Sequence, residues 1–576
     1  MSETAQFDER GRLRRRLALL LIIIAVGLGL RAVSLTRHHQ PHADGAATVM
    51  ELAAHLDDGR GYTTNRKWLF FEEHRGFPIP EGNRQPLLPL LVALLFLATG
   101  PSHTAAQWLV LAGGLLLIPL VYRLGRRLYG ARTGLLAALF TALSPAQVWF
   151  GSMVEDQALF QLGFVLLLLL WYGWWDRRER TLPFLWMGAV AGLAWLARPN
   201  GLLLLAALAV SVPLVIPAVP GWQARHRRSA AKLAGLVLVG FMALGTSWMV
   251  RNIIVFGSPF HTHNSYLMAV TVPDEVASLR DEAPTMGAWL AENGLGRAAA
   301  RWARGAFRSV DAFVSGNLFR EEAVRQGGMA VFLLLALAAW RWGPPRPAPW
   351  WRYHALPLAA FALHFLSVSW YVRGELRYFL PFYLLLYIAG ARGALVLAGI
   401  GDTERPLAAG APPRPPLPHS GRSPLLFGLL LVLLLVTFVR PLGLTLAFDD
   451  GEDTAVATEA AEWLRTNTEP GTVVMDLPTV SNLIWHYDRP TVVVPYGPLE
   501  DAFATARRFN VEYVVVSARS VAWRPGLKRF WETDGRRVRL RGTAPPFLEP
   551  AWADDDETIS IVRFIPARYH DGRSAE

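Results

Sequence analysis

Long apolar runs recur along the whole chain and constrain its fold more than any other feature. The first, Leu17–Leu35, is long enough to cross a bilayer, which requires about 20 residues. Ten more runs follow: Thr104–Tyr122, Thr133–Phe150, Gln157–Trp175, Leu182–Ala197, Gly201–Pro217, Leu233–Val250, Gly327–Trp340, Ala355–Tyr371, Tyr378–Ala391 and Pro424–Val439. Because 52% of the 576 residues are also hydrophobic, an ordinary soluble protein is excluded. The sequence predicts a polytopic α-helical membrane protein with about 11 transmembrane helices.

The basic residues follow a pattern that predicts the topology. The formal net charge is +11, and arginines gather in alternate connections between the apolar runs, as the positive-inside rule requires of cytoplasmic loops. These connections contain Arg123, Arg126, Arg127, Arg132, Arg177, Arg178, Arg180, Arg225, Arg227, Arg228, Lys232, Arg341, Arg346 and Arg352. The charge therefore reflects membrane topology and not nucleic-acid binding. We expect a multi-pass protein of the cell inner (cytoplasmic) membrane with a cytoplasmic N-terminus.

Two long connections are then expected on the outer side, at residues 36–103 and 251–326. The first carries Asp44, followed by an apolar stripe of helical period suited to a helix on the membrane surface. The apolar segment Pro86–Thr99 is too short to be counted as a span and is placed at the outer interface. His38, His39 and His42 resemble a metal cluster, but without a carboxylate at fixed spacing they are interpreted as solvated.

The second outer connection has arginines at three- and four-residue spacing on a predicted helix. They are Arg297, Arg301, Arg304 and Arg308. A helix facing solvent or lipid headgroups is favoured over a substrate site.

The composition changes sharply near the C-terminus. We expect a transmembrane domain over residues 1–441 and a soluble extracytoplasmic α/β domain over residues 442–576. Short β-rich runs at Thr472–Met475, Thr491–Val494 and Tyr513–Ser517 alternate with helical stretches at Thr458–Thr466 and Glu500–Phe509. Since the domain has no glycine-rich dinucleotide motif, no nucleotide binding is assigned.

A series of short motifs, in a fixed order along the chain, resembles a known family. They are Asn83–Pro86, Gly125–Gly130, Val154–Asp156, Ala197–Gly201, Ser247–Asn252, Phe256–Pro259 and Glu375–Pro381. Together with an acidic residue soon after the first span, this order is similar to that of the GT-C superfamily glycosyltransferases, in the bacterial branch similar to protein mannosyltransferases and the lipid A aminoarabinose transferase. Each motif alone is weak evidence, but their order and their placement at span ends are specific.

The resemblance implies roles for the acidic residues. In that family an aspartate of the first outer loop acts near the acceptor, and Asp44 matches it. A base there would take the proton of the acceptor hydroxyl during displacement at the anomeric carbon. Glu155 matches a second acidic residue and is the auxiliary catalytic candidate, with Asp156 beside it as a substrate-binding candidate. Helix capping is the alternative, by Asp44 before Ala46–Leu56 and by Asp156 at the start of the fourth span.

A leaving phosphate requires positive charge nearby, and the matching basic residues stand at the outer ends of spans. The substrate-binding candidates are Arg84, Arg198, Arg251, Arg377 and Tyr378. A guanidinium can hold a phosphate with two hydrogen bonds. The alternatives are contact with lipid headgroups for the arginines and an aromatic belt for the tyrosine.

The sequence thus predicts an inverting transferase that moves a sugar from a polyprenyl-phosphate donor to an acceptor hydroxyl or phosphate at the outer membrane face. The donor is the lipid-linked sugar, the acceptor a lipid, glycan or protein, and membrane lipids are further partners. No metal ligand is assigned, and a divalent cation, Mg²⁺ or Mn²⁺, is left open. The alternatives are a lipid or solute transporter and a non-catalytic polyprenyl-lipid-binding protein of the same fold.

Overall fold

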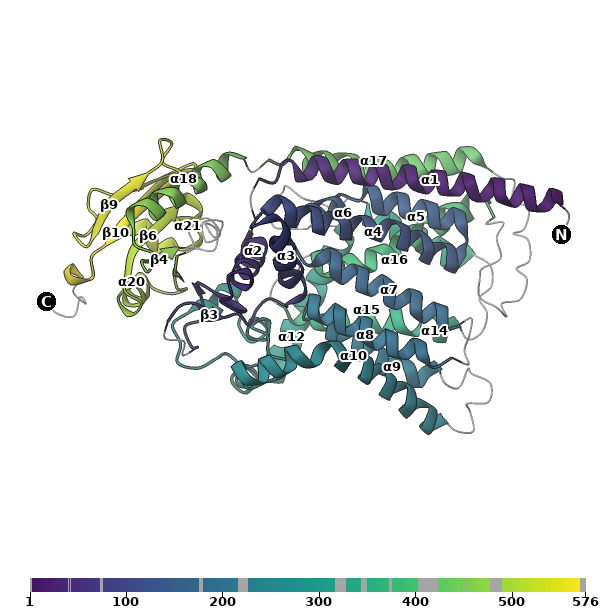
Figure 1. Ribbon diagram of the computed structural model, residues 1–576, viewed down its shortest axis with the longest axis horizontal. Coiled ribbons are helices and arrows are strands. Elements are labelled where there is room, and N and C mark those ends of the chain that lie inside the picture. Colours follow the sequence, from purple (N-terminus) through teal and green to yellow (C-terminus); the bar gives the residue numbers. More distant parts are fainter. Residues whose placement is uncertain are drawn as a thin grey trace.

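The computed structural model describes residues 3–39, 41, 43–72, 76–175, 180–215, 226–315, 328–342, 350–371, 376–401, 423–449, 451–476 and 489–569. Figure 1 shows a bundle of roughly parallel and antiparallel helices with a separate α/β domain at one end. We call the end of the bundle nearest this domain the domain end, and the other the opposite end. The N-terminus lies at the opposite end.

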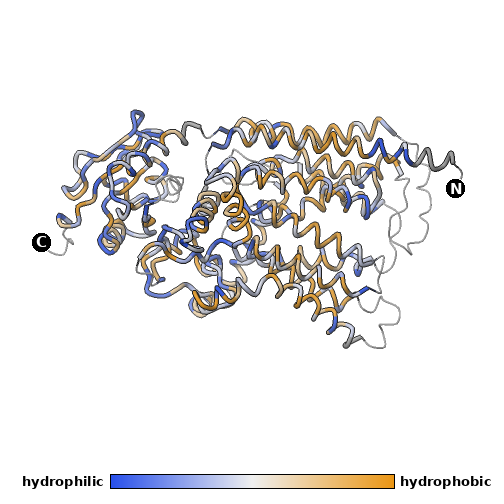
Figure 2. The backbone as a smooth tube through the Cα atoms, viewed as in Figure 1, coloured by the Kyte–Doolittle hydropathy of each residue, from blue (hydrophilic) through white to orange (hydrophobic). Residues whose placement is uncertain are grey.

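The bundle is built from the predicted apolar runs. Its helices are α1 (Glu3–Leu35), α4 (His103–Tyr129), α5 (Ala131–Leu143), α6 (Pro145–Phe150), α7 (Gln157–Trp175), α8 (Leu182–Ala197), α9 (Gly201–Val215), α10 (His226–Phe256), α13 (Met329–Trp342), α15 (Ala355–Trp370), α16 (Leu380–Leu397) and α17 (Pro424–Ala447), with the short α14 (Trp350–Tyr353) at the opposite end. Within the described residues, α1, α4, α7, α10, α16 and α17 are each long and apolar enough to cross a membrane. Apolar residues run along the bundle helices, and hydrophilic ones gather at the ends and over the α/β domain (Figure 2). The chain is a polytopic α-helical membrane protein, as predicted.

The third predicted span is divided into two helices. Residues preceding proline disfavour the α conformation, and α5 ends just before Ser144, whose successor is Pro145. The Ser144 side chain then accepts a hydrogen bond of 3.3 Å from the Gln147 amide and caps α6. This break directs the chain toward the acidic pair that precedes α7.

Glycines allow the bundle helices to approach closely. A Cβ atom added at Gly188 of α8 would lie 2.0 Å from the Val237 carbonyl oxygen of α10, and one at Gly240 would lie 2.0 Å from the Leu185 carbonyl oxygen of α8. Small residues at such crossings let the two backbones approach closely, and the resulting van der Waals packing is one of the forces that hold helices together in lipid. Each of the two helices, α8 and α10, therefore places a glycine directly against the backbone of the other.

Two shorter helices cross the domain end instead of running along the bundle (Figure 1). They are α2 (Ala43–Asp57) and α3 (Leu87–Thr99). The apolar stripe of α2 was expected to lie on the membrane surface, and this is wrong: Val49, Met50 and Ala53 are buried in a cluster with α3 and α4. Because α3 supplies an apolar face of its own, packing against it removes the stripe from solvent and lipid alike.

Hydrogen bonds join α2 to the segment that follows it. The two carboxylate oxygens of Glu51 accept from the Thr64 hydroxyl at 2.7 Å and the Asn65 amide at 2.6 Å. Burial raises the pKa of Glu51, although His55 opposes the shift. Two short strands, β1 (Thr63–Thr64) and β3 (Ile79–Pro80), then pair antiparallel and bring residues 81–84 beside α2.

The second long connection also lies at the domain end. It contains α11 (Asn264–Leu267), the 3-10 helix η3 (Pro273–Ala277) and the arginine-bearing α12 (Met286–Ser315), which confirms the helix expected there. A further 3-10 helix, η4 (Leu376–Phe379), precedes α16.

The C-terminal domain has one mixed six-stranded sheet, in the order β2-β5-β4-β6-β10-β9. The remaining elements are β2 (Arg66–Lys67), β4 (Val473–Asp476), β5 (Thr491–Val493), β6 (Val511–Ser517), β9 (Leu548–Ala553), β10 (Ile559–Phe564), the hairpin β7 (Trp531–Asp534) and β8 (Arg537–Leu540), and the helices α18 (Gly451–Asn467), α20 (Leu499–Arg508), α21 (Ala518–Trp523), η6 (Pro525–Arg529) and η7 (Pro566–Arg568). The central strands are parallel, and β10 and β9 complete one edge antiparallel. The predicted βα pattern is therefore correct, but the antiparallel edge was missed.

Alternating residues of the central strands face two helices. Val474 and Val515 pack with α18, whereas Met475, Val514 and Val516 pack with α20. This is the side-chain alternation of a sheet that is covered on both faces.

The strand β2 belongs to the first long connection, yet it pairs with β5 of the C-terminal domain. Arg66 is in register with Thr491 and Lys67 with Val492, both parallel. A second contact comes from the other connection, where the Tyr496 amide donates to the Ala277 carbonyl at 3.1 Å. The sheet is thus tied to both connections at the domain end.

The glycine contact generates a stability prediction. We expect Gly240→Leu to separate α8 from α10 and to destabilise the protein by about 1–3 kcal/mol through overpacking. Gly235→Leu on the same helix is the control, since a Cβ there meets nothing within 4 Å. Thermal unfolding in detergent measures both, and equal melting temperatures would contradict the packing argument.

Candidate functional site

An ion-pair network lies at the domain end and contains four of the predicted site residues. It consists of Arg84, Glu155, Asp156 and Arg198. The side chains of Glu155 and Asp156 are only 6% and 12% exposed. Carboxylates buried to this extent require charged or hydrogen-bonding partners, and both arginines supply them.

Arg198 contacts Asp156 from the end of α8. Its Nη1 donates to Oδ1 of Asp156 at 2.5 Å. The backbone of Arg198 is extended (φ −149°, ψ 145°) because Pro199 follows it. This conformation ends the helix and leaves the guanidinium beside the start of α7. The Asp156 carboxylate therefore pairs with an arginine, while its backbone carbonyl accepts the Phe160 amide of α7 at 3.1 Å.

Arg84 lies between the two carboxylates. Its Nη1 is 3.7 Å from Oε2 of Glu155 and 3.9 Å from Oδ2 of Asp156. Burial alone would lower the pKa of Arg84, but the two carboxylates hold it above its ordinary value. The guanidinium is therefore kept charged inside the site.

The backbone around Arg84 is fixed by its own contacts. The Glu81 carboxylate accepts the Asn83 and Arg84 amides, the latter at 3.0 Å. The Tyr62 hydroxyl donates to the Arg84 carbonyl at 3.1 Å. Hydrogen bonds to both the amide and the carbonyl of Arg84 thus fix the turn that carries it.

The first turn of α2 lies directly against this network. A Cβ atom at Gly45 would lie 2.0 Å from Oε1 of Glu155 and 2.6 Å from an Nη atom of Arg84. The backbone of Asp44 is in the same turn, one residue away, while its side chain lies outside the described residues. Since α2 begins at Ala43, Asp44 is inside the first turn and does not precede the helix as an N-cap would.

Arg377 and Tyr378 approach from η4. The charge of Arg377 is one of the causes that act on the pKa of Arg84, where it opposes the rise produced by Glu155 and Asp156. The Tyr378 ring packs edge-on against Tyr371, with centroids 5.4 Å apart. Arg377 is therefore within electrostatic range of the network, and its guanidinium carbon lies 5.5 Å from the Tyr378 ring centroid.

Arg251 occupies a neighbouring aromatic pocket. Its guanidinium carbon lies 4.7 Å from the Trp248 ring centroid and 5.0 Å from that of Phe256. One Nη atom donates to the Tyr62 carbonyl at 3.3 Å. Tyr62 thus contacts both Arg251, through its carbonyl oxygen, and the Arg84 carbonyl, through its hydroxyl.

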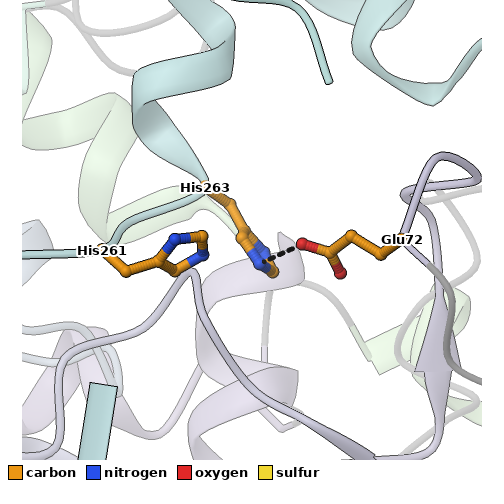
Figure 3. Close-up of side chains that lie close together, drawn as sticks. All are labelled: Glu72, His261 and His263. Carbon is orange, nitrogen blue, oxygen red and sulfur yellow. Dashed lines mark ion pairs between the residues drawn. The ribbon is translucent and has the colours of Figure 1, made fainter. Parts of the chain in front are cut away.

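A second group of titratable residues was missed by the sequence reasoning. Glu72, His261 and His263 each offer one ligand atom, and these atoms lie within 4.8 Å of one another. Figure 3 shows the His263 ring between His261 and Glu72, with Nε2 of His263 2.9 Å from Oε1 of Glu72. We call these residues the triad. The His-x-His spacing was the available signal, but Glu72 comes from another connection.

The triad fits a metal better than the histidines singled out from the sequence. His38 was expected to be solvated, which is wrong: it is 2% exposed and packs edge-on against Trp149, with ring centroids 4.7 Å apart. His39 is 3.5 Å from Asp449, and His42 lies outside the described residues.

In the triad, burial is the main cause that lowers the pKa of His261 to about 4, so this imidazole is a neutral donor. Two histidines and a glutamate form a donor set that zinc uses.

The triad adjoins the ion-pair network along the chain. The His263 amide donates to the Gly82 carbonyl at 3.1 Å, and a Cβ atom at Gly82 would meet the His263 ring at 2.4 Å. Gly82 is two residues before Arg84. A metal held by the triad would therefore fix the turn that positions Arg84.

Part of the chain matches a described protein family. Residues 83–248 match the family model of dolichyl-phosphate-mannose-protein mannosyltransferases. This segment contains all four members of the ion-pair network. No curated protein matches the chain.

Solved structures share the fold over most of the chain. The ArnT structure from Cupriavidus metallidurans bound to undecaprenyl phosphate is 14% identical, with a TM-score of 0.52 over 96% of this chain and 98% of that one. The oligosaccharyltransferase AglB from Archaeoglobus fulgidus, in complex with an inhibitory peptide and a dolichol-phosphate, is 13% identical, with a TM-score of 0.55 over 88% and 70%. The same archaeal enzyme in complex with zinc and sulfate is 12% identical, with a TM-score of 0.56 over 89% and 71%.

These matches agree with the apolar bundle and the C-terminal domain described above. The resemblance predicted from the order of the motifs is confirmed, and the chain is a polytopic membrane protein with the fold of the GT-C superfamily.

Proposed function

We propose that the protein is an inverting glycosyltransferase that takes a sugar from a polyprenyl-phosphate donor. The observation that carries the proposal is the buried ion-pair network of Arg84, Glu155, Asp156 and Arg198 against the first turn of α2. It gathers guanidinium groups and carboxylates at one end of an apolar bundle. Such a site can receive a phosphate headgroup while the lipid tail stays among the helices. Related folds are solved with undecaprenyl phosphate and dolichol-phosphate.

The reaction is a single displacement at the anomeric carbon of the sugar. An acceptor oxygen attacks this carbon, and the carbon–oxygen bond to the phosphate breaks. Asp44 takes the acceptor proton when the acceptor is a hydroxyl, and the electron pair of the broken bond leaves with the polyprenyl phosphate. One displacement inverts the stereochemistry. The close approach of Gly45 to Glu155 supports a position for Asp44 beside this reaction.

The arginines bind and orient the phosphate in this proposal. Each guanidinium has five donors in a planar fork, so Arg198 can keep its bond to Asp156 and offer others to a phosphate. Arg84 and Arg377 supply further positive charge from different connections. Charge placed where the leaving group becomes an anion stabilises the transition state more than the bound donor.

Glu155 acts as an auxiliary group. It is nearly fully buried, contacts Arg84, and faces the backbone of Gly45. It therefore holds the phosphate-binding arginine and the helix of the proposed base in one arrangement.

The topology follows from the charges. The ends of α7, α8 and α16 next to the site residues lie at the domain end, whereas Arg126 and Arg127 end α4 and Arg352 lies in α14, both at the opposite end. Under the positive-inside rule the opposite end is cytoplasmic. The site and the C-terminal domain then face the outer side of the inner membrane, where a lipid, glycan or protein acceptor is available.

The base is tested by Asp44→Asn. We expect transfer from the copurifying lipid-linked sugar to fall by about 10²–10⁴-fold, the usual loss on removing a general base. Asp57→Asn, at the other end of α2, is the control. Mass spectrometry of copurified lipids identifies the donor, and release of polyprenyl phosphate measures turnover. Wild-type turnover in D44N would rule out the base.

Substituting the arginines tests the phosphate site. Arg198→Gln and Arg377→Gln are each expected to lower kcat/KM by about 10²–10³-fold, as expected when one group that stabilises developing charge is removed. Arg180→Gln is the control, because Arg180 precedes α8 at the opposite end. If both site variants move labelled lipid between vesicle leaflets without altering its covalent structure, the protein is a transporter.

We further propose that the triad holds Zn²⁺ in a structural role. Its ligands join the first connection, through Glu72, to the one after α10, through His261 and His263. The ion would hold the turn of residues 81–84 in place, and it takes no part in the displacement.

Metal analysis tests the triad directly. The purified wild-type protein is expected to contain about one zinc ion per chain, and His263→Ala to lose it. His39→Ala is the control, since that residue lies in the other histidine group. Elemental mass spectrometry gives the content, and equal zinc in H263A and the wild type would contradict the assignment.

A further inference from the structure

The second connection contains a groove that the proposed transferase site does not use. Helix α12 changes direction at Gly294, where φ is 72°. Residues on both sides of this bend, together with Thr271, line a cavity of about 810 Å³. Its wall includes Trp289, Arg297, Arg301, Arg304, Phe307 and Arg308, and we call it the arginine groove.

The groove concentrates positive charge. The four arginines recur every three or four residues, so they share one side of the helix, and none of the residues lining the groove is acidic. Burial and the charge of Arg308 lower the pKa of Arg301, an effect that Glu275 opposes. The like charges are therefore close enough to disfavour one another, and an anion between them would relieve this cost.

One arginine is already fixed as part of the wall. Arg301 donates to the carbonyl oxygens of Met268 and Val270, both at 2.8 Å, and lies 4.7 Å above the Trp289 ring. Arg297, Arg304 and Arg308 are exposed. The groove thus has a rigid base and three guanidinium groups near solvent.

Packing places the groove at the domain end of the bundle. A Cβ atom at Gly305 would lie 1.9 Å from the Ser369 carbonyl oxygen, and the Trp302 indole donates to the Leu366 carbonyl at 3.3 Å. Both carbonyls belong to the last turns of α15, at the domain end of the bundle. Helix α12 therefore lies against the end of α15 at the domain end of the bundle (Figure 1). In the proposed topology this end of the bundle meets the headgroups of the outer leaflet.

Apolar side chains accompany the charges. Leu295 and Phe307 are 82% and 76% exposed. A helix that presents arginines next to exposed apolar residues suits the boundary between headgroups and acyl chains. A soluble phosphate compound would use only the arginines and leave these apolar groups in water.

We propose that the arginine groove binds the phosphate headgroup of an anionic phospholipid of the surrounding leaflet and so seats the second connection on the membrane. The phosphate lies among Arg297, Arg304 and Arg308, and the acyl chains run past Phe307. This lipid is neither donor nor acceptor, so the proposal stands apart from the sugar-transfer site.

The test compares lipid binding by the full-length protein. Native mass spectrometry in detergent, with added dioleoylphosphatidylglycerol, gives the affinity of the wild type and of the triple variant R297Q/R304Q/R308Q. We expect about a ten-fold or larger loss, because each arginine near an anionic surface contributes to attraction. The matched control is R536Q/R537Q/R541Q, three exposed arginines on and beside the β7–β8 hairpin. The variant R297K/R304K/R308K should retain most of the binding, which separates lost charge from misfolding.

Several outcomes would overturn the proposal. It is wrong if the glutamine variant binds phosphatidylglycerol like the wild type, or if dioleoylphosphatidylcholine binds the wild type equally well. Displacement by millimolar inorganic phosphate would identify a soluble ligand instead. Undecaprenyl phosphate should bind the glutamine variant normally, and an equal loss there would make the groove part of the donor site. Sugar transfer that persists in this variant leaves the proposed function intact.

Discussion

The ion-pair network at the domain end is the interaction on which the site depends. Arg84 comes from the first connection, Glu155 and Asp156 precede α7, and Arg198 ends α8. Removing one partner from such a buried group leaves an uncompensated charge, which is far more costly than the net gain from the pair. The network therefore holds three segments in one geometry. In the proposed function the same charges bind the phosphate, so stability and binding would depend on the same residues.

The fold was largely predictable because membrane-length apolar runs have few structural options. A backbone in lipid must satisfy its own hydrogen bonds, and helices do this locally. The C-terminal strand at Val511–Ser517 could also be predicted from the sequence, since runs of β-branched residues favour buried strands. The apolar stripe of α2 was wrongly predicted to lie on the membrane surface, because the stripe itself does not show that α3 packs against it. Burial against protein and burial in lipid produce the same pattern in sequence.

The site was only partly predictable, for a related reason. Arg84, Glu155 and Arg198 could be named as candidates from their motifs, but which carboxylate each arginine contacts depends on how α7 and α8 pack. The pairing of Arg198 with Asp156 needs both the helix end set by Pro199 and the start of α7. The triad was harder still, because Glu72 and His261 are brought together only by tertiary structure. His38 was expected to be solvated, but its ring is buried against Trp149.

The strand β2 makes the C-terminal domain inseparable from the membrane part. It is one edge strand of the six-stranded sheet, although more than 400 residues separate Lys67 from Val492 in the sequence. If residues 451–569 were produced alone, β5 would become an unprotected edge, and such edges recruit other chains. The domain would then tend toward self-association, and supplying residues 62–68 as a separate peptide could restore a monomer.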